Sequence, residues 1–399
     1  MERKDQPRCG AYPLRYPRPG AAAWRRPELS RANHLRQGSS RTRSSLCHRR
    51  DQARARSGLE TGGNFRKRHS QDRSLVSGQP GLGRKYHQRC LPRLGEQTLP
   101  MKILLLGANG QVGWELQRAL APLGRLEICD RLRADLDRPE SLAALVERIQ
   151  PQVIVNAAAY TAVDKAESDA ARSRRVNAES VEVLADAARS CDAWLVHYST
   201  DYVFDGCKAA AYTEDDPVGP LSVYGQTKLE GEQAIQASGC KHLILRTSWV
   251  YAARGSNFIK TMLRLAAERE ELRVIADQIG APTSAELIAD VSALLLYRLR
   301  HDRALAEQAT GVYHLTAAGE TSWHGYARFV VAKAAALDMS LKAGPDDIHA
   351  IGTADYPLPA RRPANSRLDT GKLRRTFDLH LPQWEYHVER MLHELLAKP

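Results

Sequence analysis

The sequence lacks any run of 18 or more apolar residues, which excludes a membrane-spanning helix of ordinary length. Its most apolar helical stretch, residues 287–299, is interrupted by Asp290 and Ser292. The sequence also lacks a CxxC motif, and its seven cysteines are scattered and odd in number. The pattern therefore speaks against a disulfide scaffold and a cysteine-rich zinc site, and it fits a reducing cytoplasm.

Three quarters of the chain lack any excess of positive charge, although the 399 residues together carry a formal net charge of +12. Residues 1–100 hold 23 Lys and Arg against 7 Asp and Glu, a net charge of +16. Residues 101–399 hold 35 Lys and Arg against 39 Asp and Glu, a net charge of −4. The basic excess therefore indicates no nucleic-acid partner for the main part of the chain.

Residues 1–100 are rich in Arg, Ser, Gly and Pro and show no period of a strand or helix. Such a composition buries too little apolar surface to offset chain entropy, so we expect disorder. Three interpretations compete: a basic arm for nucleic acid, a targeting peptide, and a non-native extension from an upstream start. The acidic residues and the length argue against a targeting peptide. We favour the extension, because a well-formed strand follows Met101 at once.

A glycine-rich loop follows the first strand pattern. Residues 102–106 form a short apolar run, typical of a central parallel strand, and lead into Gly107, Gly110 and Gly113. An amphipathic helix comes next. This order is typical of a dinucleotide site, where the backbone approaches a pyrophosphate at a helix N-terminus. The spacing is GxxGxxG rather than GxGxxG, and a tight structural turn is the alternative interpretation.

A second strand pattern ends in Asp130, about 20 residues after the glycines, where a carboxylate can accept from the adenosine ribose hydroxyls. Arg131 and Arg133 follow and can meet a 2′-phosphate. The carboxylate favours NADH and the arginines favour NADPH, so the choice between the two coenzymes stays open. Asp135 and Leu136 lie in the next loop, where an adenine edge can lie.

The third strand pattern, residues 153–159, ends in small residues and leads into Tyr160 and Thr161. Small residues at the carboxyl end of a strand leave room for a cofactor, although close packing of strand and helix is the alternative. We expect Asp137 to cap a helix over residues 140–149. Strands and helices alternate throughout this half, which predicts an α/β fold with a right-handed, doubly wound, Rossmann-like parallel sheet.

A candidate catalytic group follows the fourth strand pattern, which ends in Thr200. Tyr224 and Lys228 stand four residues apart and so share one face of a helix. We expect the lysine ammonium to favour the phenolate and to lower the pKa of the tyrosine, so that it exchanges a proton with a carbonyl oxygen near neutral pH. Alone, the tyrosine would be a packed core residue and the lysine a solvated one.

After residue 250 the regular alternation weakens. We therefore expect an NAD(P)-binding domain over 101–250 and a smaller substrate-binding region over 251–399 that is partly interleaved with it. The predicted elements of that region are strands over 272–275 and 311–315 and helices over 286–300 and 323–337. Arg361, Arg362 and Arg367 lie in a later aperiodic segment, where they suit a diphosphate or form a solvated cluster.

From Met101 onward the chain resembles the extended short-chain dehydrogenases/reductases and, among them, the dTDP-4-dehydrorhamnose reductase family. The resemblance runs almost end to end over residues 101–399, whereas residues 1–100 have no counterpart in the family. The segments that carry it are GANGQVGWELQRAL (107–120), NAAAYTAVDKAE (156–167), HYSTDYVFDG (197–206), PLSVYGQTKLEGE (220–232), LRTSWVYA (245–252), NFIKTMLRLA (257–266), DQIGAPT (277–283) and RPANSRLDT (362–370).

The resemblance implies NADPH- or NADH-dependent reduction of the C4 keto group of dTDP-4-dehydro-β-L-rhamnose to dTDP-β-L-rhamnose, a donor for cell-surface polysaccharide. It implies that Tyr224 gives the proton, that Lys228 tunes it and holds the nicotinamide ribose, and that Thr200 bonds the sugar oxygen. Substrate contacts are implied for Thr200, Asp201 and Trp249, the last with core packing as its alternative. The implied cofactor-binding residues are Gly107, Gly110, Gln111, Val112, Gly113, Asp130, Asp135, Leu136, Ala159, Tyr160, Thr161, Tyr224 and Lys228.

Some family members bind Mg²⁺ at a dimer interface, and Glu115, Glu286 and Glu394 stand at matching places. The resemblance thus implies Mg²⁺ and a homodimer, but these acids have no ligand spacing to interpret, so the metal stays open. His197 and His314 lie in strand patterns and are expected to be core or hydrogen-bonded residues rather than ligands. The expected partner is a nucleotide sugar, without nucleic acid or membrane.

Two other functions share this fold. A nucleotide-sugar dehydratase or epimerase keeps its NAD bound, but dehydratases similar to this region carry Glu after the Thr-Asp pair, where this chain has Tyr202. A non-catalytic regulatory subunit is the second alternative, and the intact Thr200, Tyr224 and Lys228 favour an enzyme over it.

Overall fold

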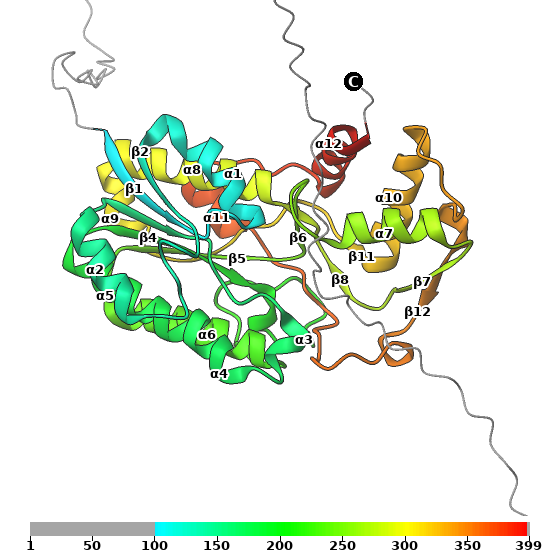
Figure 1. Cartoon of the computed structure of the whole chain (residues 1–399), viewed down its shortest axis with the longest axis horizontal. Helices are drawn as coiled ribbons and strands as arrows, with labels where there is room; N and C mark the ends of the chain where they lie inside the picture. The colour runs from blue at the N-terminus through cyan, green and yellow to red at the C-terminus, as the bar shows by residue number, and fades with distance from the viewer. Residues whose placement is uncertain (1–99, 397–399) are drawn as a thin grey trace, which may run out of the picture. The chain divides into compact units, whose positions relative to one another are not determined.

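The computed structural model describes residues 100–396, and the predicted disorder of the N-terminal segment lies outside them but for its last residue. The centre of the described chain is a six-stranded parallel sheet in the order β10-β5-β4-β3-β1-β2 (Figure 1). Its strands are β1 Met101–Leu106, β2 Gly124–Cys129, β3 Val153–Asn156, β4 Trp194–Thr200, β5 His242–Thr247 and β10 Gly311–His314.

Helices cover both faces of this sheet (Figure 1). In β1, Ile103 and Leu105 enter one apolar cluster together with residues of α1 and α8, while Leu104 and Leu106 enter a second cluster with residues of α2, α5 and α6. From Ile103 to Leu106 the strand is apolar at every position, because neither face of this stretch meets water. The predicted doubly wound α/β sheet is thus confirmed. These helices are α1 Gln111–Leu120, α2 Glu140–Ile149, α5 Ser180–Ser190, α6 Val223–Ser238 and α8 Ala285–His301.

The remaining elements form smaller groups. Three short sheets pair β6 Val250–Tyr251 with β9 Thr283–Ser284, β7 Leu272–Ile275 with β12 Ile348–Ile351, and β8 Ile279–Gly280 with β11 Thr321–Ser322. A separate apolar cluster joins β7 and β12 to α7 and α10. The remaining helices are α3 Val163–Ala166, α4 Ala170–Arg174, α7 Phe258–Glu268, α9 Arg303–Gln308, α10 Trp323–Ala336, α11 Gly371–Phe377 and α12 Trp384–Leu396.

The strand order reverses beside β1. The chain passes from β1 to β2 on one side, and then returns to place β3 on the other side. A crevice opens at such a switch point, outside the carboxyl ends of the strands, and ligands of open α/β sheets bind there. Residues beyond 250 also contribute to this part of the molecule, because β10 pairs with β5 and α8 packs against α1.

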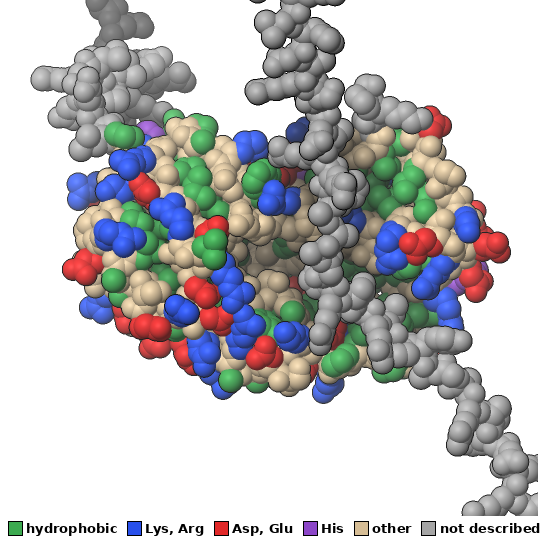
Figure 2. Space-filling model, in the orientation of Figure 1, with side chains coloured by type: hydrophobic (Ala, Val, Ile, Leu, Met, Phe, Trp, Pro, Cys, Tyr) green, Lys and Arg blue, Asp and Glu red, His purple; other side chains and the backbone are tan. Residues whose placement is uncertain are grey.

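Most predicted element bounds agree with the structure to within one or two residues. One exception is the strand predicted over residues 153–159, since β3 ends at Asn156. The π-helical turn over Arg175–Glu179, between α4 and α5, has no counterpart among the predicted elements. Another exception is β12, which lies in the segment that lacked periodicity. Within residues 100–396, no helix is long and apolar enough to cross a membrane. Acidic and basic side chains are interspersed on the face shown in Figure 2, consistent with the near-balanced charge.

Candidate active site

A cavity of about 720 Å³ lies at the carboxyl ends of the central strands. Its walls come from the loop after β1, from the ends of β3 and β4, from the first turns of α6 and from residues 247–256. Most of the predicted site residues line this one cavity. They are Gly107, Gly110, Gln111, Val112, Asp135, Leu136, Ala159, Tyr160, Thr161, Thr200, Asp201, Tyr224, Lys228 and Trp249.

The glycine loop is shaped by close backbone contacts. Gly107 has φ +76°, and a Cβ there would lie 2.5 Å from the backbone nitrogen of Ala158. A Cβ on Gly113 would lie 2.1 Å from the carbonyl oxygen of Gly107, so Gly113 does not line the cavity but lets α1 pack under the loop. No side chain caps the N-terminus of α1 at Gly110. Free N–H groups at a helix N-terminus suit a pyrophosphate, and the residues present fit the predicted dinucleotide.

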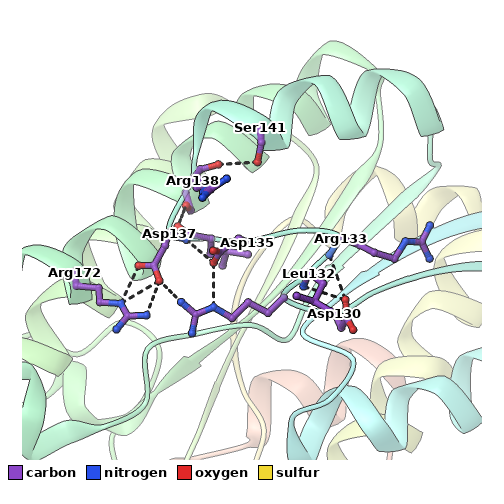
Figure 3. Close-up of polar contacts among 11 residues, drawn as sticks. Asp130, Leu132, Arg133, Asp135, Asp137, Arg138, Ser141 and Arg172 are labelled. Atoms are coloured by element: carbon purple, nitrogen blue, oxygen red, sulfur yellow. Dashed lines mark hydrogen bonds and ion pairs between the residues drawn. The ribbon is translucent and has the colours of Figure 1, made fainter.

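Charged side chains gather at one end of the cavity (Figure 3). Arg131, Asp135, Asp137 and Arg172 all line it. The Asp137 carboxylate accepts from Nε and Nη2 of Arg172 at 3.0 and 2.6 Å, pairs with Arg131, and has a lowered pKa, chiefly through the Arg172 hydrogen bond. The predicted helix cap at Asp137 is wrong, because α2 begins after Pro139 and the guanidinium groups hold the carboxylate.

Asp130 is not among the residues that line the cavity. Its Oδ1 accepts from the backbone N–H groups of Leu132 and Arg133 at 3.1 and 3.2 Å and so shapes the turn after β2 (Figure 3). The Arg133 guanidinium donates to the carbonyl of Ile128 at 2.6 Å. The predicted contact of Asp130 with the adenosine ribose stays a prediction.

The candidate catalytic side chains converge from β4 and α6. Thr200 ends β4, and its Oγ1 accepts from the backbone N–H of Tyr202 at 3.2 Å and donates to Oδ1 of Asp201 at 3.1 Å. Tyr224 stands in the first turn of α6, which Ser222 caps by accepting from the N–H of Gly225 at 3.2 Å. One helical turn later, the buried Lys228 also faces the cavity.

Burial dominates the pKa values of this group. It raises the pKa of Tyr224 to about 12, partly offset by a hydrogen bond with Thr200. The downward shift predicted from the sequence is wrong, because removal of the phenol from water outweighs that bond and Lys228 Nζ is bound to the Tyr198 carbonyl at 2.7 Å. Burial also lowers the pKa of Lys228 to about 8 and raises that of Asp201 to about 7.

Two stacked tryptophans line the cavity beyond Tyr224. The rings of Trp249 and Trp323 have centroids 3.7 Å apart and planes 14° apart. Trp249 has φ +48°, a rare backbone conformation for such a residue, and a Cβ on Gly280 would lie 2.7 Å from its ring. Trp249 therefore both packs and faces the cavity. Trp323 was not predicted as a site residue, because its local sequence marks only the start of a helix.

Other lining residues also have no local signal in the sequence. Arg172 comes from α4, and its position beside Asp137 depends on tertiary packing rather than on any local motif. Conversely, the three predicted arginines of the aperiodic segment do not line the cavity. Arg362 pairs with Asp164 at 2.9 Å, and Arg367 with Glu320 at 3.4 Å.

The predicted metal ligands do not form a site among residues 100–396, where no group of three or more His, Cys, Asp or Glu is placed to hold a metal. Glu115 and Glu286 lie near each other, since Glu286 contributes to the raised pKa of Glu115. However, Glu286 pairs with Arg390 at 2.9 Å, and Glu115 lies 3.7 Å from Arg118. Each of these two carboxylates thus has a guanidinium group nearby, and Mg²⁺ gains no support from the described residues.

Comparison with known proteins gives a consistent result. The family described as RmlD substrate binding domain matches residues 101–397. The dTDP-4-dehydrorhamnose reductase of Burkholderia thailandensis is 52% identical over 298 residues, which cover 75% of this chain and 100% of that protein. Its counterpart from Escherichia coli K12 is 52% identical over 301 residues, covering 74% of this chain and 99% of that protein.

Solved structures agree as well. The crystal structure of dTDP-4-dehydrorhamnose reductase from Bacillus anthracis in complex with NADP is 33% identical, with a TM-score of 0.66, and covers 74% of this chain and 100% of its own. The UDP-glucose 4-epimerase of Thermus thermophilus with NAD has a TM-score of 0.61, covers 75% of this chain and 100% of its own, and is 18% identical, so it shares the fold alone.

Proposed function

The chain belongs to the dTDP-4-dehydrorhamnose reductase family, and from this premise we propose that it reduces the C4 keto group of dTDP-4-dehydro-β-L-rhamnose to give dTDP-β-L-rhamnose. The observation that carries the proposal is that the glycine loop, Thr200, Tyr224 and Lys228 line one cavity. A glycine loop alone indicates only nucleotide binding. Together with a proton donor in the same cavity, it indicates nicotinamide-dependent carbonyl reduction.

A nicotinamide coenzyme supplies the hydride when it is bound. The open N-terminus of α1, with Gly110, Gln111 and Val112, is suited to its diphosphate. Ala159 and Tyr160 border the cavity at the end of β3, toward the catalytic side chains, where the nicotinamide is expected. Gly107 and Gly113 contribute indirectly, because they allow the loop to lie against β3 and α1.

The adenosine end carries two arginines and two aspartates in the cavity wall, so its formal charge is balanced. Arg131 and Arg172 can meet a 2′-phosphate, whereas Asp135 and Asp137 already hold these guanidinium groups. This balance favours neither NADPH nor NADH by charge alone. We therefore propose that both coenzymes are accepted.

Tyr224 is the proposed proton donor. Its raised pKa keeps the phenol protonated at neutral pH, so the proton is present until the C4 oxygen gains negative charge. Thr200 is hydrogen-bonded to this phenol and is the proposed second contact of the C4 oxygen. Lys228 is the proposed partner of the nicotinamide ribose, and its lowered pKa reflects its burial beside the reacting groups.

The sugar nucleotide is proposed to lie against Asp201 and the stacked Trp249 and Trp323. Flat aromatic faces suit the apolar faces of a deoxysugar or of a pyrimidine base, and buried polar groups fix its orientation. We propose that the substrate-binding region is built around α7, α10 and the β7–β12 pair, which share an apolar cluster of their own. The homodimer and the cytoplasmic location remain predictions.

The test is a reductase assay on the purified full chain, with dTDP-4-dehydro-L-rhamnose generated in place and NADPH or NADH supplied. We expect coenzyme oxidation equal in amount to the dTDP-rhamnose formed. The matched comparison uses dTDP-4-keto-6-deoxyglucose without the enzyme that converts it into the substrate. A protein that retains NAD through gel filtration and converts the sugar without net coenzyme oxidation would be an epimerase or dehydratase instead.

A further inference from the structure

A buried chain of hydrogen bonds links Lys228 to the wall of the cavity near the end of β3. Nζ of Lys228 lies 2.9 Å from Nε2 of His197 on β4, and Nδ1 of His197 lies 3.1 Å from Nδ2 of Asn156 on β3. Oδ1 of Asn156 accepts from the backbone N–H of Ala158, a lining residue, at 3.2 Å. The three side chains are at most 1% exposed, so their polar atoms depend on one another.

The backbone fixes the orientation of the Asn156 amide. The N–H of Ala158 can only donate, so it must face the amide oxygen, and the amide nitrogen then faces His197. His197 Nδ1 accepts that hydrogen bond and carries no proton. Since burial holds the pKa of His197 well below its usual value, the ring is neutral and its single proton lies on Nε2.

The Nε2–H group of His197 therefore points at the amino group of Lys228. An ammonium group has three donors and no acceptor, so it would set two donors against each other at 2.9 Å. A neutral amine has a lone pair that accepts this hydrogen, while one of its own hydrogens goes to the Tyr198 carbonyl at 2.7 Å. The hydrogen-bond pattern is complete only when Lys228 is neutral.

We propose that His197 is a positioning residue for Lys228: held by Asn156 in its Nε2–H form, it fixes the lysine side chain and favours the neutral amine. The role of Lys228 in the reaction rests on the proposed function, but the hydrogen-bond pattern does not. Burial acts in the same direction and lowers the pKa of Lys228 to about 8. Protonation of Lys228 then breaks the hydrogen bond that His197 Nε2–H donates to the amine. The charge of the Lys228 side chain and its position are therefore coupled.

The charged and titratable groups around this pair come from α6, β4 and β5. Glu232 on α6 raises the pKa of the lysine, but its carboxylate is paired with Arg246 on β5, with Nη2 and Oε2 at 2.6 Å. Tyr224 on α6 and Asp201 after β4 both have pKa values raised by burial. On β3, Asn156 is uncharged. Among these groups, none other than His197 donates a hydrogen bond that would favour the neutral amine of Lys228.

The first test observes the imidazole directly. Two-bond ¹H–¹⁵N correlation spectra of the labelled full chain, with His197 assigned through the His197→Gln variant, are expected to show a protonated Nε2 and a bare Nδ1 between about pH 6 and 9. Asn156→Asp should reverse this state, because a carboxylate accepts from Nδ1–H. A native Nδ1–H form, or an imidazolium in this range, would overturn the proposal. This readout needs no substrate, so it stands even if the proposed function fails.

The second test follows Lys228 itself. A glutamine amide at position 197 can turn its oxygen toward an ammonium group, so in His197→Gln we expect the Lys228 pKa to rise by about one unit or more, with a matching shift in the pH profile of kcat. The control is His314→Gln, the same change at a fully buried histidine of β10 in the same sheet, which should leave that pKa in place. An unmoved pKa in His197→Gln, or an equal shift in the control, contradicts the proposal. If His197→Gln does not fold, the native and Asn156→Asp spectra decide, with His197 assigned as the histidine whose signals Asn156→Asp changes.

Discussion

The two ends of the cavity are built in different ways. At the proposed coenzyme end the diphosphate site rests on backbone, since Gly107 to Gly110 form a turn into α1 whose shape depends on the absence of side chains. The proposed sugar end rests on side chains from segments far apart in the sequence, of which Trp249 and Trp323 are the largest. The coenzyme end should therefore be sensitive to added atoms and the sugar end to removed ones.

The largest effect is expected where the two ends meet. Tyr224→Phe removes the proposed proton donor without changing the size of the ring, so kcat should fall by roughly 10²–10⁴-fold while coenzyme affinity stays within about twofold. Stopped-flow assays and coenzyme titration measure the two quantities. Tyr212→Phe is the control, because that hydroxyl bonds Asp205 at 2.6 Å and lies outside the cavity wall. Near-normal turnover of Tyr224→Phe would show that Tyr224 is not the proton donor.

The next effect tests the coenzyme end with one added methyl group. In Gly113→Ala the new Cβ meets the Gly107 carbonyl, so the loop must move and the KM for the coenzyme should rise by about 10²-fold. Gly239→Ala is the control, since that glycine has φ +70° with no atom within 4 Å of a Cβ. It should cost roughly 1 kcal/mol of stability and leave coenzyme binding unchanged. Equal coenzyme KM values in both variants would contradict a backbone-built site.

A smaller effect is expected at the sugar end. Trp323→Ala removes the ring stacked on Trp249, so the KM for the sugar nucleotide should rise by about tenfold, the size of one lost aromatic contact, while the coenzyme KM stays the same. Trp114→Ala is the control, because Trp114 is half-exposed on α1 and contacts Arg254 rather than the cavity. If the coenzyme KM changed and the sugar-nucleotide KM did not, Trp323 would belong to the coenzyme end, and its assignment to the sugar end would be wrong.

The same contrast explains what could be predicted from the sequence. The glycines after β1 lie within one short segment, and Tyr224 and Lys228 lie one helical turn apart, so local patterns alone predict both groups. Trp323 and Arg172 were missed because only tertiary packing brings them to the cavity. The cap assigned to Asp137 and the pKa direction of Tyr224 failed for a related reason, since guanidinium partners and burial have no local signal.

The smallest effect concerns the cost of keeping a carboxyl group at the sugar end. Burial raises the pKa of Asp201 to about 7, whereas in the unfolded chain it titrates near its ordinary value of 3.8. Between these values the folded state binds more protons, so this group makes the protein less stable as pH rises, and the loss is complete above about pH 7. Asp201→Asn cannot ionise. We therefore expect it to melt a few degrees above the native protein at pH 8, with a smaller gain at pH 5, and to bind the sugar nucleotide more weakly. A gain independent of pH would show that the native carboxyl stays ionised in the fold.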